Sequence, residues 1–158
     1  MRMNGYDYLE GIGMKTFIAL LLLLPVIAGC ATPSQIMLDA EVKRLCAIDG
    51  GIKVYETVRL PAERFKLGYL RLLSKDMAKP EDEYYYESSM SYIEKGNPEM
   101  WQLHFKIYRR VDNKLLGEAI SYARRGGDIP GPWHDSSFMC PDRADVSDLE
   151  KRIFTKID

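Results

Sequence analysis

The sequence has little of what catalytic, metal and nucleic-acid sites are built from. Among its 158 residues are three cysteines, two histidines and two tryptophans, and 22 basic side chains are balanced by 23 acidic ones, for a net charge of −1. Nucleic-acid binding normally requires a basic surface, which this balance does not favour. Glycine motifs that bind phosphate are also absent. We therefore expect no nucleic-acid partner and no cofactor.

Long hydrophobic runs are absent as well. The longest, Phe17–Ile27, has eleven residues without a charge. As a helix it would measure about 16 Å, roughly half of the hydrocarbon core of a bilayer. It follows Met14-Lys15, and a basic start, a short apolar stretch and a small-residue cleavage point are the three parts of a secretory signal. The sequence thus predicts export rather than a permanent transmembrane helix.

The end of this stretch, Ile27-Ala28-Gly29-Cys30, resembles the lipobox of bacterial lipoproteins. In that class an aliphatic residue and two small residues precede a cysteine that receives a diacylglycerol, and the signal is cleaved before it. The resemblance implies that residues 14–29 are a signal peptide and that Cys30 is lipidated. Two or three acyl chains suffice for a stable anchor, since each buried methylene contributes about 0.8 kcal/mol. The alternative is a buried apolar helix with a chance cysteine.

Residues 1–13 fit this signal poorly, because Asp7 and Glu10 cancel the positive charge that an export signal carries at its start. We expect that Met14 is the true initiator and that the upstream stretch comes from a mis-called start. It is therefore excluded from the fold.

The mature chain begins at Cys30 and is the right size for one domain. We expect residues 30–33 to be a short lipid-anchored linker and residues 34–158 a single globular domain. In bacteria with two membranes, the lipoprotein sorting rule places a chain with Ala31 after the lipidated cysteine on the outer membrane. The expected location is therefore the periplasmic face of the outer membrane, with the lipid on Cys30 as the membrane contact.

Two cysteines, Cys46 and Cys140, remain in the mature chain. In an oxidising compartment an even number most simply forms a disulfide. A bond between Cys46 and Cys140 would close a loop over a sequence separation of 94 residues. Closing a loop of this length contributes about 4–5 kcal/mol to stability in chain-entropy models, and often less in practice. The alternatives are a reactive thiol, an intermolecular bridge, or a zinc site with His104 and His134. Zinc ligands normally come in close sequence pairs, which these residues do not form.

The mature chain begins and ends with helical patterns. Ser34–Ile48 has apolar residues near helical spacing with Ser34 as a possible cap, and the Asp49-Gly50-Gly51 turn ends it. A last helix is expected to start after Asp145 or Ser147 and to run towards Phe154. Between them, residues 61–80 are ambiguous, with a possible helical turn at Ala62–Phe65.

Four strands are expected between the helices, and they are Ile52–Leu60, Tyr84–Ile93, Met100–Arg110 and Leu115–Arg124. Met100–Arg110 is the clearest, because apolar and polar residues alternate along it. Gly126–Pro141, with three glycines and three prolines, is expected to be irregular. The sequence predicts an α+β fold: an antiparallel sheet of about four strands with an N-terminal and a C-terminal helix on one face, stapled by one disulfide.

The segment Gly126–Pro141 holds the candidate binding residues Trp133, His134, Phe138 and Asp128. A tryptophan held among glycines and prolines is a rigid aromatic projection of the kind that dominates binding hot spots. The alternative is structural, in which Trp133 covers the sheet and the prolines route the chain back to Cys140.

Catalysis is the weaker prediction. His134 could pair with Asp49 or Asp128 in a cell-envelope hydrolase, but no spacing motif supports it and no G-x-S-x-G turn is present. His104 falls on the polar face of its strand and is expected to be exposed to solvent.

In size and expected location the mature chain resembles small lipoproteins of the bacterial envelope. The absence of a metal cluster, a nucleophile motif and a cofactor fingerprint favours a non-catalytic binding or structural module that contacts an envelope protein or the cell wall. The alternatives are the hydrolase and an exclusion or inhibitor lipoprotein.

Overall fold

The computed structural model describes residues 31–66, 68–131 and 134–157. The predictions for residues 1–13, the signal peptide 14–29, Cys30 and Trp133 therefore concern positions outside the described residues. From Pro33 onward the chain forms one compact unit. None of the helices in the described part is long and apolar enough to cross a membrane.

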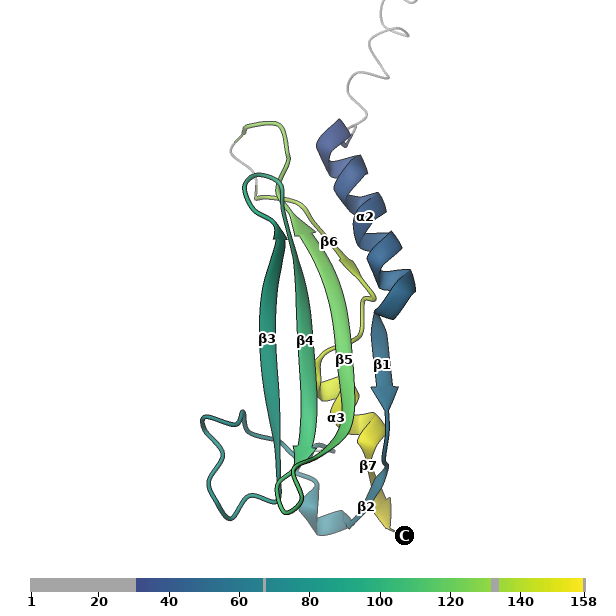
Figure 1. Cartoon of the computed structure of the whole chain (residues 1–158), viewed down its shortest axis with the longest axis vertical. Helices are drawn as coiled ribbons and strands as arrows, with labels where there is room; N and C mark the ends of the chain where they lie inside the picture. Colours follow the sequence, from purple (N-terminus) through teal and green to yellow (C-terminus); the bar gives the residue numbers. More distant parts are fainter. Residues whose placement is uncertain (1–30, 67, 132–133, 158) are drawn as a thin grey trace, which may run out of the picture. The chain divides into compact units, whose positions relative to one another are not determined.

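The elements follow one another in an order that mixes helices and strands (Figure 1). They are α2 (Pro33–Asp49), β1 (Gly51–Val54), β2 (Val58–Pro61), the short 3-10 helix η1 (Ala62–Arg64), β3 (Tyr84–Glu94), β4 (Glu99–Arg109), β5 (Lys114–Arg125), β6 (Ser137–Cys140), α3 (Val146–Ile153) and β7 (Phe154–Ile157). An antiparallel sheet has the order β1-β5-β4-β3, and β6 also pairs with β5. The predicted α+β fold with an antiparallel sheet and two helices is confirmed.

Strand β5 is the centre of the sheet. One of its edges pairs with β4 along the whole strand, and its other edge pairs with two shorter strands, β1 and β6. β1 pairs with the first half of β5, at Gly117 to Ile120, and β6 pairs with its last residues, Tyr122 to Arg125. The sheet therefore has two halves, one beside β1 and one beside β6.

The two helices pack on opposite faces of this sheet, whereas the sequence led us to expect them on one face. Paired residues in neighbouring strands point to the same face, and successive residues alternate. Gly117 lies under α3, since a Cβ there would be 2.9 Å from Ile153 Cδ1. Ile120 and Tyr122 instead pack against Val42 of α2. From Gly117 onward, odd positions of β5 thus lie on the face that α3 covers and even positions on the face that α2 covers. Leu116 is the extra residue where the register with β4 shifts, and it packs in the core under α3.

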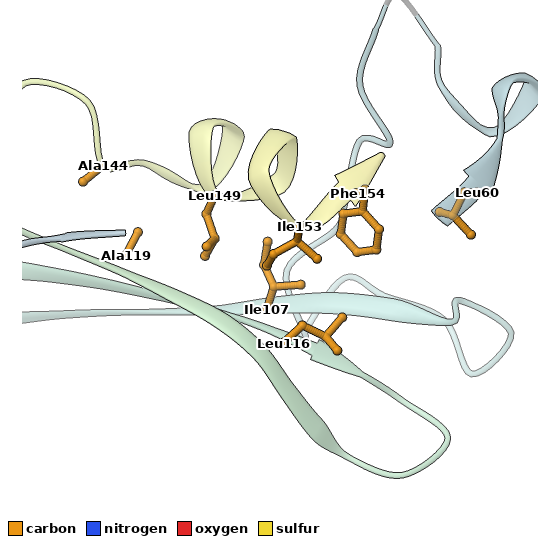
Figure 2. Packing of buried hydrophobic residues seen from close by; sticks show 8 residues of the cluster. All are labelled: Leu60, Ile107, Leu116, Ala119, Ala144, Leu149, Ile153 and Phe154. Atoms are coloured by element: carbon orange, nitrogen blue, oxygen red, sulfur yellow. The ribbon is translucent and has the colours of Figure 1, made fainter. Parts of the chain in front are cut away.

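An apolar core holds α3 against the half of the sheet beside β1. Figure 2 shows Leu149 and Ile153 pointing from the helix towards Ile107 and Leu116 of the strands. All four side chains have no exposed surface. Asp145 caps the helix, because its carboxylate accepts a hydrogen bond from the Asp148 N–H at 2.9 Å. This helix start agrees with the sequence prediction.

The second core lies under α2 and includes the predicted disulfide. Val42 packs on Met100, Ile120 and Tyr122. Cys46 at the end of the helix is bonded to Cys140 at the end of β6, with the two Cα atoms 5.9 Å apart. The disulfide prediction is confirmed, and the zinc alternative is wrong because both sulfurs are used in this bond.

Several element boundaries differ from the prediction. The predicted strand Ile52–Leu60 is two strands, because after β1 the chain leaves β5 and β2 pairs in parallel with β7. The segment Gly126–Pro141, expected to be irregular throughout, contains β6. Helix α2 begins at Pro33, so Ser34 lies within its first turn instead of capping it. Proline is favoured at this position since its missing N–H has no partner there in any case.

Candidate functional site

Asp128, a predicted binding residue, is engaged in holding its own loop. Its carboxylate accepts hydrogen bonds from the Ser136 backbone N–H at 2.7 Å and from Gln35 Nε2 at 2.9 Å. The Ser136 N–H is the main cause that lowers the pKa of Asp128 below its ordinary value, and the Gln35 amide contributes. The side chain therefore fixes the segment after β5 to the first turn of α2.

Arg124 strengthens the same junction from inside the protein. Its guanidinium is buried and donates to Asp39 Oδ1 at 2.7 Å, to the Gly126 carbonyl at 2.9 Å and to Ser136 Oγ at 2.9 Å. A buried guanidinium is tolerated when its donors are satisfied and a carboxylate balances its charge. The α2 helix and the segment after β5 are thus joined by a polar network.

The other three predicted binding residues do not share one described surface. Phe138 is half-buried and packs against the core under α2, where the Lys43 ammonium lies 5.3 Å from its ring centroid. His134 is exposed to solvent. Trp133 lies outside the described residues. The structure therefore places Asp128 and Phe138 in structural contacts and leaves His134 accessible.

The two carboxylates that we considered as partners of His134 lie at opposite ends of α2. Asp49 is its last residue and accepts a hydrogen bond from the Tyr122 hydroxyl at 2.8 Å. Asp128 is bonded to Gln35 in the first turn. Within the described part of the chain, no hydrogen bond or ion pair joins His134 to either carboxylate, and no cluster of metal-ligating side chains is found.

His104 is less exposed than its position on a polar strand face suggests. Its Nε2 atom lies 2.7 Å from Glu118 Oε2, and the Tyr55 hydroxyl donates to the other oxygen of the same carboxylate. The Tyr55 hydrogen bond is the largest cause that lowers the pKa of Glu118, and His104 contributes. The expectation of a solvent-exposed histidine is therefore corrected to a partly buried side chain in a hydrogen-bonded group of three.

The largest feature that sequence reasoning missed is an apolar sheet face on which neither of the described helices α2 and α3 packs. We call it the aromatic sheet face, and it is formed by side chains from β3, β4 and β6. Strand register aligns Tyr92, Trp101, Ala123 and Met139 in one row, and Met90, Leu103 and Ser121 in the next. These positions of β5 are odd-numbered, so the face is opposite to α2, and α3 packs on the half of the sheet beside β1.

Large apolar side chains on this face are open to solvent. Met90, Tyr92 and Met139 keep 51%, 48% and 41% of their surface exposed. Trp101 and Leu103 are half-buried between them, and the Trp101 ring stands edge-on to Tyr92 with centroids 6.3 Å apart. Contiguous apolar surface of this kind on a soluble domain commonly marks a contact site.

The alternating pattern of β4 was the available signal for this face. It shows that Trp101 and Leu103 share an apolar face, and the ordinary interpretation is that such a face is covered by a helix. The sequence did not show that α2 packs on the other side, which leaves the aromatic sheet face without a helix among the described residues.

Comparisons with known proteins found no relationship for this chain. No family model matches it, and no curated protein or solved structure is similar enough to count as a match.

Proposed function

We propose that this chain is a lipid-anchored protein of the bacterial envelope that works as a non-catalytic binding module, with the aromatic sheet face as its contact surface for a protein. The observation that carries the proposal is the row of Tyr92, Trp101 and Met139 beside Met90 and Leu103, on which no described helix packs and where both methionines and Tyr92 are exposed. The anchor on Cys30 rests on the lipobox resemblance, and the location on the periplasmic face of the outer membrane rests on Ala31 at the next position.

A protein is the partner that this surface fits best. Tyrosine, tryptophan and methionine are enriched in the buried centres of protein interfaces, where charged residues are depleted. Methionine side chains are flexible and polarisable, which lets them adapt to a facing side chain. Cell-wall glycan would require several hydrogen-bonding groups around the aromatic rings, yet the polar residue in the second row, Ser121, is buried.

A polar rim at one edge of the face agrees with this view. The Lys95 ammonium lies 5.8 Å from the centroid of the Tyr92 ring, and it follows Glu94 at the end of β3. Interfaces commonly have an apolar centre and a charged, solvent-accessible margin. An exclusion or inhibitor lipoprotein would use the same kind of contact, and the identity of the partner would distinguish it from a structural role.

Site-specific photo-crosslinking in living cells tests the proposal. A photoreactive amino acid at Met90 should give a discrete protein adduct, whereas the same amino acid at Met77 should give none. Met77 is the matched control because it is also an exposed methionine, with 70% of its surface accessible, but lies in the loop before β3. Adducts of equal yield from both positions, or none from Met90, would contradict the proposal.

A further inference from the structure

Three segments that are distant in sequence meet at the end of the domain where α2 begins. They are the first turns of α2, the turn between β3 and β4 at residues 95–98, and the segment after β5 at residues 126–131 (Figure 1). Gln35 Nε2 donates to Asp128 at 2.9 Å, and the Gly127 N–H donates to Asn97 Oδ1 at 2.6 Å. We call this region the α2 start.

The α2 start carries large apolar side chains that are exposed to solvent. Ile36, Met37 and Ile129 keep 58%, 72% and 66% of their surface exposed. A groove of about 380 Å³ lies between α2 and the β3–β4 turn. Its walls combine the apolar Met37, Leu38 and Pro98 with polar residues, which are Ser34, Glu94, Lys95 and Asn97. Because α2 and the β3–β4 turn are both hydrogen-bonded to the segment at residues 126–131, the two sides of the groove are held in place while Met37 on its wall stays exposed.

Covalent geometry places this region close to any lipid on Cys30. Only Ala31 and Thr32 separate that cysteine from Pro33, the first residue of α2. An extended chain advances at most 3.3–3.6 Å per residue, so three steps reach about 11 Å. Ile36 and Met37 lie only one helical turn further on, and a turn rises about 5.4 Å.

We infer that the α2 start docks on the lipid bilayer that holds the anchor, with Ile36, Met37 and Ile129 inserted at the interface. The inference rests on the proposed lipidation of Cys30. The bilayer is the occupant that the short connection imposes, since a lipidated chain cannot move this end far from the membrane. Tyr92 and Trp101 of the aromatic sheet face lie a few residues from the β3–β4 turn. A protein bound to this face would therefore contact the domain near the membrane.

The charges around the α2 start indicate how the docking works. Glu94 and Lys95 have opposite signs, and Asp128 is held by hydrogen bonds within the protein. Among the described residues of the three segments Lys95 is the one cation, so they form no basic cluster of the kind that binds anionic headgroups. Contact with the bilayer therefore depends on apolar insertion, and we expect it to be insensitive to salt and to the content of anionic lipid.

The experiment uses the mature lipidated protein, purified from cells and reconstituted in vesicles of phosphatidylethanolamine and phosphatidylglycerol. A photoreactive amino acid is placed at Ile129 or, as the control, at Val111, and lipid adducts are counted by mass spectrometry. Val111 is also an exposed aliphatic residue, with 87% of its surface accessible, but it lies in the β4–β5 turn at the other end of the same strands. We expect at least a tenfold higher yield of lipid adduct at Ile129.

Lipidation is measured in the same samples with an alkyne-tagged fatty acid fed to the cells. A labelled Cys30 with equal lipid adducts at both positions would overturn the docking and leave the anchor intact. A labelled Cys30 with a protein adduct between two copies at Ile129 would overturn it in favour of a dimer. An unlabelled Cys30 would overturn the anchor and the docking together.

Discussion

The two halves of the sheet each have one face covered by a helix, but their open faces differ in character. In the half beside β1, α3 covers one face, and the open face bears His104, Lys106 and Glu118, which are polar. In the half beside β6, α2 covers the other face, and the open face bears Met90, Tyr92 and Trp101. An antiparallel sheet normally turns a polar face to water. The first half follows this rule and the second does not, which is why we assign a contact to the second.

The covered faces differ as well. Under α3 the contact is made by fully buried aliphatic side chains such as Leu149 and Ile153. Under α2 the apolar contact is smaller, and a disulfide and the buried Arg124 network join the helix to the sheet. We conclude that the half beside β1 is held by apolar burial, and the half beside β6 by specific links.

Removing the Cys46–Cys140 disulfide, in the half beside β6, should have the largest effect on stability. Replacing both Cys46 and Cys140 by serine should lower the free energy of unfolding by about 4 kcal/mol, since the bond closes a loop over a sequence separation of 94 residues. Urea denaturation of the oxidised parent and the variant measures it. A loss below about 1 kcal/mol would mean that α2 is held by its other contacts alone.

In the half beside β1, Leu149→Ala should lower the free energy of unfolding by about 3 kcal/mol, because it removes a fully buried side chain from a packed core. Ile157→Ala is the matched control, because that side chain is half exposed on β7. This substitution should lower the free energy of unfolding by less than about 1 kcal/mol. Denaturant titration of both variants checks this. Equal losses would show that the core under α3 is not the main source of stability there.

A smaller effect is expected on the open polar face. Hydrogen bonds from Tyr55 and His104 lower the pKa of Glu118 in the folded protein. Its contribution to stability is therefore present above the unfolded pKa and is lost as the pH falls through the lower folded value. Glu118→Gln should lower the free energy of unfolding by less than about 1 kcal/mol at pH 7. The difference in stability between the parent and the variant should disappear in acid, and denaturant titration at several pH values measures it. A difference that is independent of pH would contradict the assignment.

Much of the fold followed from local sequence patterns. The alternation of Trp101, Leu103 and Phe105 identified β4, and the cysteine count predicted the bond between Cys46 and Cys140. Asp145, one of the two predicted starts of the last helix, is the residue that caps α3. Each of these signals is contained in a short segment or in the composition, so no knowledge of distant contacts was needed.

The features that failed depend on contacts between distant segments. β5 is buried on both faces, with Ala119 and Ile120 both in the core, so its sequence gives no alternation that could assign a helix to either side. The burial of Arg124 requires Asp39 and Ser136, which approach only in the folded chain. β7 follows α3 without a turn, so no glycine or proline marks it.

The candidate site could be predicted only in part for the same reason. The sequence pointed to Trp133, His134, Phe138 and Asp128 because unusual residues gather in one segment. The aromatic sheet face is assembled from three strands, and its exposure depends on which face α2 covers.

Methionine oxidation in intact cells tests the central claim most directly, because the chain carries its own reporters. Met90 and Met139 lie on the aromatic sheet face, Met77 is exposed elsewhere, and Met100 is buried as an unreactive reference. Brief peroxide treatment of cells and of the purified protein is followed by peptide mass spectrometry. We expect Met90 and Met139 to be oxidised at least fivefold more slowly in cells than in the purified protein, while Met77 reacts equally in both. Oxidation of all three at unchanged rates in cells would show that no partner covers this face.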